Sequence, residues 1–160
     1  MYGVSCNAKR RGFTLLELML VLSLLSILTA LTVPKLIRFH SRWVLRSTAH
    51  MIANDIRLIQ KKSIDECTYY NFELETEKFY YYLKNSDPSK PQTKKVVIDP
   101  RITTITSTLK KYYAGENYCV LQFTPLGSPN QAGTITLYTA YGDNINITID
   151  VATGRVKVNE

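Results

Sequence analysis

Residues 13–33 read FTLLELMLVLSLLSILTALTV, and Glu17 carries the only charge among them. Leu and Ile favour a helix, and neither Gly nor Pro interrupts the run. At ~1.5 Å per residue, these 21 residues would span the ~30 Å hydrocarbon core of a bilayer. A helix buried in a soluble core would be apolar on one face, whereas this segment is apolar all round. The sequence therefore predicts a transmembrane helix over residues 13–34.

A removable secretory signal is the alternative explanation for this segment. Such signals have ~7–15 apolar residues followed by a small-residue cleavage site. The run here is longer, and Thr29-Ala30-Leu31 is a weak site. Pro34 follows the run, and its ring disfavours helix at Val33. Because the helical pattern resumes afterwards, we expect a kink or a locally melted turn at Pro34 rather than the end of the helix.

Charge is distributed unevenly at the N-terminal end. Residues 1–12 contain Lys9, Arg10 and Arg11 and no acid. Glu17 is the anomaly, since a carboxylate in an apolar helix costs a few kcal/mol on insertion scales. Its position leaves two interpretations open: a partner on another subunit, or a boundary charge at the membrane surface.

The stretch KRRGFTLLE, residues 9–17, resembles the class III leader of type IV prepilins and pseudopilins. In that family a dedicated peptidase cuts after the Gly and methylates the new N-terminal Phe. The resemblance implies that residues 1–12 are a leader peptide, with Gly12 its last residue and Phe13 the methylated first residue of the mature chain. Glu17 matches the family's recurrent Glu, which implies pairing with the α-amino group of Phe13 on a neighbouring subunit. Pro34 falls where many members also carry Pro.

Residues 35–66 predict an amphipathic helix that belongs to the head. One apolar stripe recurs at helical spacing and should pack on the head: Val44, Ile52, Ile56 and Ile59. A second face carries four basic residues at three- and four-residue steps: Lys35, Arg38, Arg42 and Arg46. We expect no acid within reach to neutralise them, so they could meet anionic lipid, acidic faces of neighbouring subunits, or water. Because basic residues flank both ends of the span, the orientation rests on the resemblance rather than on the positive-inside rule.

Residues 67–160 are rich in Tyr, Thr, Ile and Val and predict a β-rich head. The expected strands cover residues 68–74, 78–84, 95–98, 102–109, 118–124, 133–140, 144–151 and 155–158. The last three should form an antiparallel meander. The predicted fold class is therefore α+β, a type IV pilin-like lollipop whose long N-terminal helix packs on an antiparallel β-sheet head.

Three motifs in the head resemble the GspH/FimT branch of minor pilins and pseudopilins. They are LQFTPLG at 121–127, GTITL at 133–137 and GRVKV at 154–158. In some FimT-type competence pilins a C-terminal GRxR is implicated in DNA capture. Here Lys157 takes the second basic place, so the resemblance implies a DNA contact through Arg155 and Lys157 that lacks one bidentate Arg. Alternatively, Arg155 caps the glycine turn and Lys157 faces water.

The overall charge does not decide for DNA. Without the three leader bases, 17 basic residues face 13 acidic ones, a net charge of +4. This is mildly basic for a nucleic-acid-binding protein. Two lysine pairs could add phosphate contacts or stacking, or could keep edge strands soluble: Lys94-Lys95, and Lys110-Lys111 next to Tyr112-Tyr113.

The remaining chemistry-bearing residues are few. Cys6 lies in the leader, and an extracytoplasmic head would permit a disulfide between Cys67 and Cys119, although two free thiols are equally open. His40 and His50 lie on different helix faces, so no metal site is expected. The sequence holds no Gly-rich phosphate loop, H-E-x-x-H, C-x-x-C or G-x-S-x-G. We therefore expect neither an enzyme nor a cofactor.

These features together predict a minor pilin or pseudopilin that assembles into, or primes, a type IV pilus-like filament. Contact with DNA for uptake stays open beside the alternative that Arg155 and Lys157 are ordinary surface residues. Its expected partners are other pilins or pseudopilins, the prepilin peptidase, an inner-membrane assembly platform, membrane lipid and double-stranded DNA. Before assembly it would be a single-pass membrane protein with an extracytoplasmic head, and afterwards part of a surface or periplasmic filament. The alternatives are a minor pseudopilin of type II secretion and an uncleaved membrane-anchored surface protein.

Overall fold

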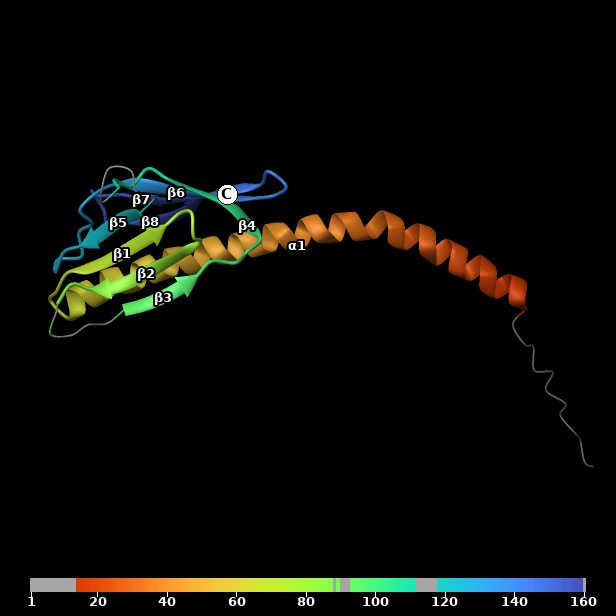
Figure 1. Ribbon diagram of the computed structural model, residues 1–160, viewed down its shortest axis with the longest axis horizontal. Coiled ribbons are helices and arrows are strands. Elements are labelled where there is room, and N and C mark those ends of the chain that lie inside the picture. Colours follow the sequence, from red (N-terminus) through yellow and green to blue (C-terminus); the bar gives the residue numbers. More distant parts are fainter. Residues whose placement is uncertain (1–13, 88, 90–92, 112–117, 160) are drawn as a thin grey trace, which may run out of the picture. The chain divides into compact units, whose positions relative to one another are not determined.

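The computed structural model describes residues 14–87, 89, 93–111 and 118–159 (Figure 1). In this part of the chain, one helix, α1 (Leu15–Asp65), is followed by eight strands. The strands are β1 (Tyr70–Glu75), β2 (Tyr80–Asn85), β3 (Thr93–Val97), β4 (Ile102–Ser107), β5 (Tyr118–Phe123), β6 (Gly133–Thr139), β7 (Asn144–Ile149) and β8 (Val156–Asn159). Each lies within two residues of its predicted bounds. The chain divides into two compact units, one ending at Ile37 and the head unit from Arg38 to Glu160.

The first part of α1 suits an apolar environment. Thr14 caps the helix, because its Oγ1 accepts a hydrogen bond from the backbone amide of Glu17 at 3.2 Å. Within the apolar run, Ser and Thr hydroxyls donate to backbone carbonyls of the preceding turn, as Thr29 does to Leu25 at 3.0 Å. Every side chain from Thr14 to His40 is exposed in the isolated chain. Among the described residues, α1 is long and apolar enough to cross a membrane.

Pro34 lies inside α1 and does not end it. The helix is continuous from Leu15 to Asp65, a length of 51 residues. The structure therefore has no melted turn at Pro34, and a bend at this residue stays a prediction.

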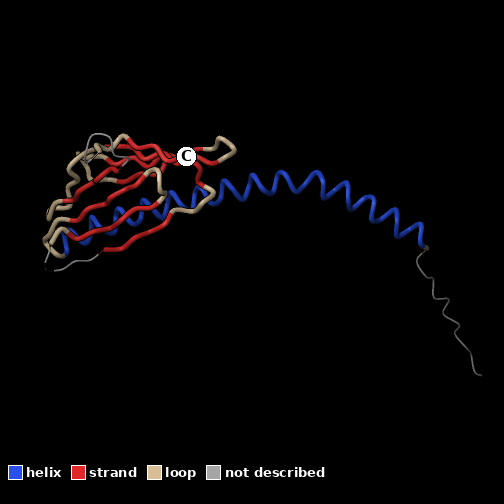
Figure 2. Tube along the Cα trace, in the orientation of Figure 1, coloured by secondary structure: helices blue, strands red, loops and turns tan. Residues whose placement is uncertain are grey.

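The strands form two antiparallel sheets rather than the single sheet predicted (Figure 2). One sheet has the order β3-β2-β1-β5 and the other has the order β4-β6-β7-β8. The division arises because β5 pairs with β1, with Leu74 opposite Cys119, while β4 pairs with β6. The predicted meander is confirmed, since β6, β7 and β8 are successive neighbours in the second sheet.

The head part of α1 is buried against both sheets. Its predicted apolar stripe is confirmed, with Ile52 and Ile56 fully buried and Val44 and Ile59 nearly so. These residues join one core with buried side chains from both sheets: Phe72, Leu74, Leu121, Phe123, Ile135, Leu137, Ile147 and Ile149. The large apolar area removed from water makes this core the main stabilising element of the head. The predicted fold class is thus confirmed, with two sheets in place of one.

Two buried tyrosines hold the outer end of α1 to the first sheet. The Tyr81 hydroxyl donates to Asp55 Oδ2 at 2.7 Å, and the Tyr70 hydroxyl donates to Glu66 Oε2 at 2.9 Å. Burial, with help from the hydrogen bond to Glu66, raises the pKa of Tyr70 to about 12. Burial and Asp55 likewise raise the pKa of Tyr81. Both tyrosines therefore stay protonated and serve as hydrogen-bond donors in the folded head.

Candidate functional site

The predicted cleavage site, Gly12 and Phe13, lies outside the described residues. Glu17 lies in the first turn of α1 and is exposed. There its carboxylate is close to the positive end of the helix dipole, which favours an anionic residue. Among the residues that the structure describes, no basic side chain forms an ion pair with Glu17. Within this described part, the carboxylate is therefore available to a cation of another chain.

The two motif glycines meet at one point on the helix. Gly127 and Gly154 both have positive φ, at +77° and +62°. Gln60 of α1 donates from Nε2 to the Gly127 carbonyl at 2.9 Å and to the Gly154 carbonyl at 3.0 Å. A Cβ at Gly154 would lie 2.7 Å from that same Nε2 atom. The glycines thus let two turns approach the helix closely enough to share one amide, which we call the glycine clasp (Gln60, Gly127 and Gly154).

A second bond from α1 fixes the start of the last strand. Arg57 donates to the Val156 carbonyl at 2.6 Å and to the Asn54 side-chain oxygen at 2.9 Å. Val156 is buried, while Arg155 and Lys157 on either side of it are exposed. The backbone of the GRVK motif is therefore held by the helix, and its two basic side chains face away from the core together.

An acid lies beside this basic pair. Asp150 accepts hydrogen bonds from the Thr153 hydroxyl at 2.8 Å and the Ala152 amide at 3.0 Å. These bonds, and then the charges of Lys157 and Arg155, lower the pKa of Asp150. The carboxylate therefore stays ionised and offsets part of the positive charge at Arg155 and Lys157. The backbone amide of Asp150 also donates to the Arg155 carbonyl at 3.0 Å, which closes the turn.

The two lysine pairs do not form one basic patch. Lys94 lies 3.7 Å from Asp55, and Lys95 lies over the Tyr80 ring, 3.9 Å from its centroid. Lys110 and Lys111 lie beyond β4, beside the groove with Asn71 and Gln122. Tyr112-Tyr113 lies outside the described residues.

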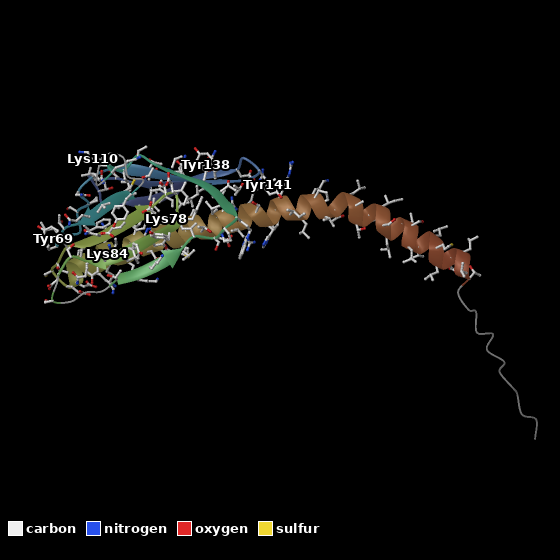
Figure 3. All side chains as sticks on the ribbon, viewed as in Figure 1. Tyr69, Lys78, Lys84, Lys110, Tyr138 and Tyr141 are labelled. Carbon is white, nitrogen blue, oxygen red and sulfur yellow. The ribbon has the colours of Figure 1, made fainter. Side chains whose placement is uncertain are left out.

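Sequence reasoning missed a Tyr–Lys array on the outer face of the first sheet. Tyr80 and Tyr82 pack edge to face at 5.2 Å between ring centroids, and Lys84 lies over Tyr82 at 4.9 Å. Lys84 also pairs with the carboxylate of Glu73, and Tyr118 hydrogen-bonds the same group. Alternation of Tyr80, Tyr82 and Lys84 along one strand could have revealed this face. Its acids balance its lysines, so it is no concentrated positive site. In Figure 3 the labelled Lys84 lies on the β2 side of the head.

The proposed disulfide is wrong, because both thiols are free. Cys119 is buried opposite Leu74, whereas Cys67 is exposed and precedes β1. Tyr70 pairs with Phe123 at the end of β1 near Cys67, so Cys119 lies four residues further along the ladder. Four residues of strand correspond to ~13 Å, well beyond the ~7 Å limit between the Cα atoms of a disulfide.

The expectation that no acid reaches the basic helix face is also wrong. Arg42 Nε lies 2.9 Å from Asp143 Oδ1, and Asp143 belongs to the turn between β6 and β7. The Arg38 guanidinium lies 5.9 Å from the ring centroid of Tyr141 in the same turn. Separate on the helix, His40 stacks on Trp43 and contacts Arg101. Among the described residues, no cluster of His, Cys, Asp and Glu could hold a metal ion.

Comparisons with known proteins give a motif and a fold. Residues 7–33 match a protein-family profile described as a prokaryotic N-terminal methylation motif. No curated protein sequence matches the chain. The fold is similar to that of the minor pseudopilin EpsH from the Type 2 Secretion System of Vibrio cholerae, with a TM-score of 0.58, 9% identity, and coverage of 72% of this chain and 95% of that one.

The type IV minor pilin FimU of Pseudomonas aeruginosa is similar too, with a TM-score of 0.58, 16% identity, and coverage of 76% of this chain and 92% of that one. Both likenesses concern the fold, and the profile match adds the N-terminal motif. The chain thus combines the prokaryotic N-terminal methylation motif with the fold of minor pilins and pseudopilins.

Proposed function

We propose that this protein is a minor pilin or pseudopilin subunit, cleaved after Gly12, methylated at Phe13 and assembled into a type IV pilus-like filament. The observation that carries the proposal is the methylation motif at residues 7–33, which includes the apolar first part of α1, on a helix that continues into a pilin-type head. Such an order of motif, span and head is what a filament subunit requires. In the head, the polar contacts of Gln60 and Arg57 hold turns and the last strand to the helix.

Glu17 supplies the assembly chemistry in this proposal. A carboxylate among apolar side chains is costly without a partner. Leader removal creates an α-amino group at Phe13, and this cation on a neighbouring subunit pairs with Glu17. The peptidase, the inner-membrane assembly platform and the other pilins are the partners at this stage.

The proposal is tested by incorporation into filaments when the full chain is expressed with its neighbouring pilins. The wild-type chain should appear in the sheared filament fraction. Glu17→Gln should remain in the membrane fraction with its leader removed, and the surface variant Lys78→Gln should assemble normally. Equal incorporation of Glu17→Gln would contradict the assembly role.

DNA contact is a second candidate function, favoured by the joint exposure of Arg155 and Lys157 on either side of the buried Val156, at the start of β8. Asp150 opposes it electrostatically, so affinity should be modest and salt-dependent. The head, residues 38–160, would be titrated with double-stranded DNA across a salt series. Loss of binding in Arg155→Ala/Lys157→Ala, but not in the matched control Lys61→Ala/Lys78→Ala, which removes two exposed lysines elsewhere, would support the contact. Equal binding by both variants would show that Arg155 and Lys157 do not contact DNA.

The two structural neighbours belong to two kinds of assembly, a type IV pilus and a type II secretion system. EpsH is a minor pseudopilin and FimU is a minor pilin, and each aligns over more than nine-tenths of its own length. A pseudopilin of type II secretion is therefore the alternative within the same proposal. An uncleaved membrane-anchored surface protein is the alternative outside it.

A further inference from the structure

Aromatic and basic side chains gather on one face of α1 where the head unit begins. We call Arg38, Phe39, Arg42 and Trp43 the collar. Phe39 is 69% exposed and Trp43 is 60% exposed, although both are large and apolar. Side chains of this size are usually covered in a folded soluble head, so their joint exposure indicates a partner.

One side of the collar forms a groove of about 480 Å³, lined by Phe39, Arg42, Trp43, Arg46, Asp143 and Ile145. The turn between β6 and β7 makes the opposite wall, where Figure 3 labels Tyr141. Arg42 is held by Asp143 at 2.9 Å, and Arg38 lies over Tyr141. Arg38 and Arg42 lie with the single carboxylate of Asp143 at this wall, so these three groups carry a net positive charge that suits an anion.

The other side of Trp43 is bounded by the segment between β3 and β4. His40 stacks on Trp43 with ring centroids 6.5 Å apart, and Arg101 contacts His40. Asp99 pairs with Arg101 at 3.0 Å. Trp43 is therefore supported on one ring face while most of its surface remains exposed. A supported and exposed indole is suited to an interface between apolar and aqueous surroundings.

The place of the collar on α1 identifies the partner. Arg38 follows Val33 by five residues, and Trp43 follows Phe39 by one helical turn. Side chains on a helix lean toward its N-terminus, so the collar side chains lean back toward the apolar run. Trp and Arg in this position are typical of the headgroup layer of a bilayer.

We propose that the collar binds anionic phospholipid headgroups while the protein waits in the membrane before assembly. The guanidinium groups of Arg38 and Arg42 contact the lipid phosphate, and Phe39 and Trp43 contact the upper acyl chains. This inference rests on the membrane insertion included in the proposed function. The partner is a lipid rather than a neighbouring subunit because the collar adjoins the membrane span on the same helix.

Trp43 is the chain's single tryptophan, so its fluorescence reports on the collar alone. The full chain would be placed in vesicles of zwitterionic lipid containing a minor fraction of anionic lipid brominated near the top of its chains. A parallel sample would carry the same fraction of brominated zwitterionic lipid. One basic residue near the membrane surface raises the affinity for anionic over zwitterionic lipid by roughly five-fold. With one or both arginines in contact, the relative affinity for the anionic lipid, obtained from the two quenching curves, should be roughly 5- to 25-fold higher.

Arg38→Gln/Arg42→Gln should bring the two quenching curves together, whereas Lys78→Gln/Lys110→Gln removes the same charge elsewhere and should leave the preference intact. Added salt should reduce the preference of the wild-type chain for the anionic lipid. Equal quenching by both lipids, or no quenching, in a chain that floats with the vesicles would overturn the lipid site and leave the proposed function standing. A chain that does not float with vesicles would overturn both.

Discussion

Replacement of Gly154 by alanine should destabilise the head by about 3–4 kcal/mol. An alanine at a φ of +62° costs roughly 1–2 kcal/mol. The new Cβ would also lie 2.7 Å from Gln60 Nε2 and displace it. The amide would then lose its bonds to the Gly127 and Gly154 carbonyls, at about 1 kcal/mol each. The positive φ and the lost clasp therefore contribute comparable amounts.

Gly142→Ala is the matched control for this substitution. Gly142 has a φ of +82°, and a Cβ there would meet nothing within 4 Å. It should therefore cost only the roughly 1–2 kcal/mol of the backbone term. The free energy of unfolding of the head, residues 38–160, would be measured by circular dichroism in denaturant. Costs for Gly154→Ala and Gly142→Ala that agree within about 0.5 kcal/mol would refute the clasp.

A double-mutant cycle separates the clasp from unrelated strain. In a Gln60→Ala background the two hydrogen bonds are already absent, so Gly154→Ala should cost about as much as Gly142→Ala. A full cost in that background would show that the Cβ clashes with something other than the Gln60 amide.

Three further predictions concern the head. Burial raises the pKa of Tyr70 from 10.0 to about 12 in the folded head, so this tyrosine ionises first in the unfolded chain as the pH rises. The free energy of unfolding should therefore fall between pH 10 and 12, and it should fall less steeply in Tyr70→Phe, as measured by denaturant unfolding across this pH range. Cys67 should react with a thiol reagent in the native head, while Cys119 reacts only after unfolding, and two fast-reacting thiols would contradict its burial. Arg42→Gln should change the free energy of unfolding by less than about 1 kcal/mol, because its pair with Asp143 is exposed on the arginine side; a larger loss in thermal melts would show a structural role.

Local patterns predicted the elements well because their causes are local. The stripe from Val44 to Ile59 follows helical periodicity, and alternation in β7 places Ile145, Ile147 and Ile149 in the core. The pairing of the strands was not predictable in this way. Leu74 opposite Cys119 depends on which strands meet across a long connection, and that choice separates two sheets and keeps Cys67 from Cys119.

The candidate site likewise contains residues that the sequence could identify and residues that only the folded structure reveals. The motif around Gly154 could be found from its resemblance, and so could the cleavage position and Glu17. The helix residue Gln60 could not, because its carbonyl partners lie 67 and 94 positions away. The pairing of Asp143 with Arg42 was not predictable for the same reason, since the two residues are 101 positions apart. Contacts at such separations follow from the folded arrangement and leave no spacing pattern in the sequence.

Intact-mass and N-terminal analysis of the full chain, co-expressed with a prepilin peptidase, tests the central claim most directly. The proposed function predicts loss of residues 1–12 and a single methyl group on the α-amine of Phe13. A Gly12→Val variant should keep its leader under the same conditions. A wild-type chain that retains residues 1–12 beside an active peptidase would contradict the claim and identify the protein as an uncleaved membrane-anchored head.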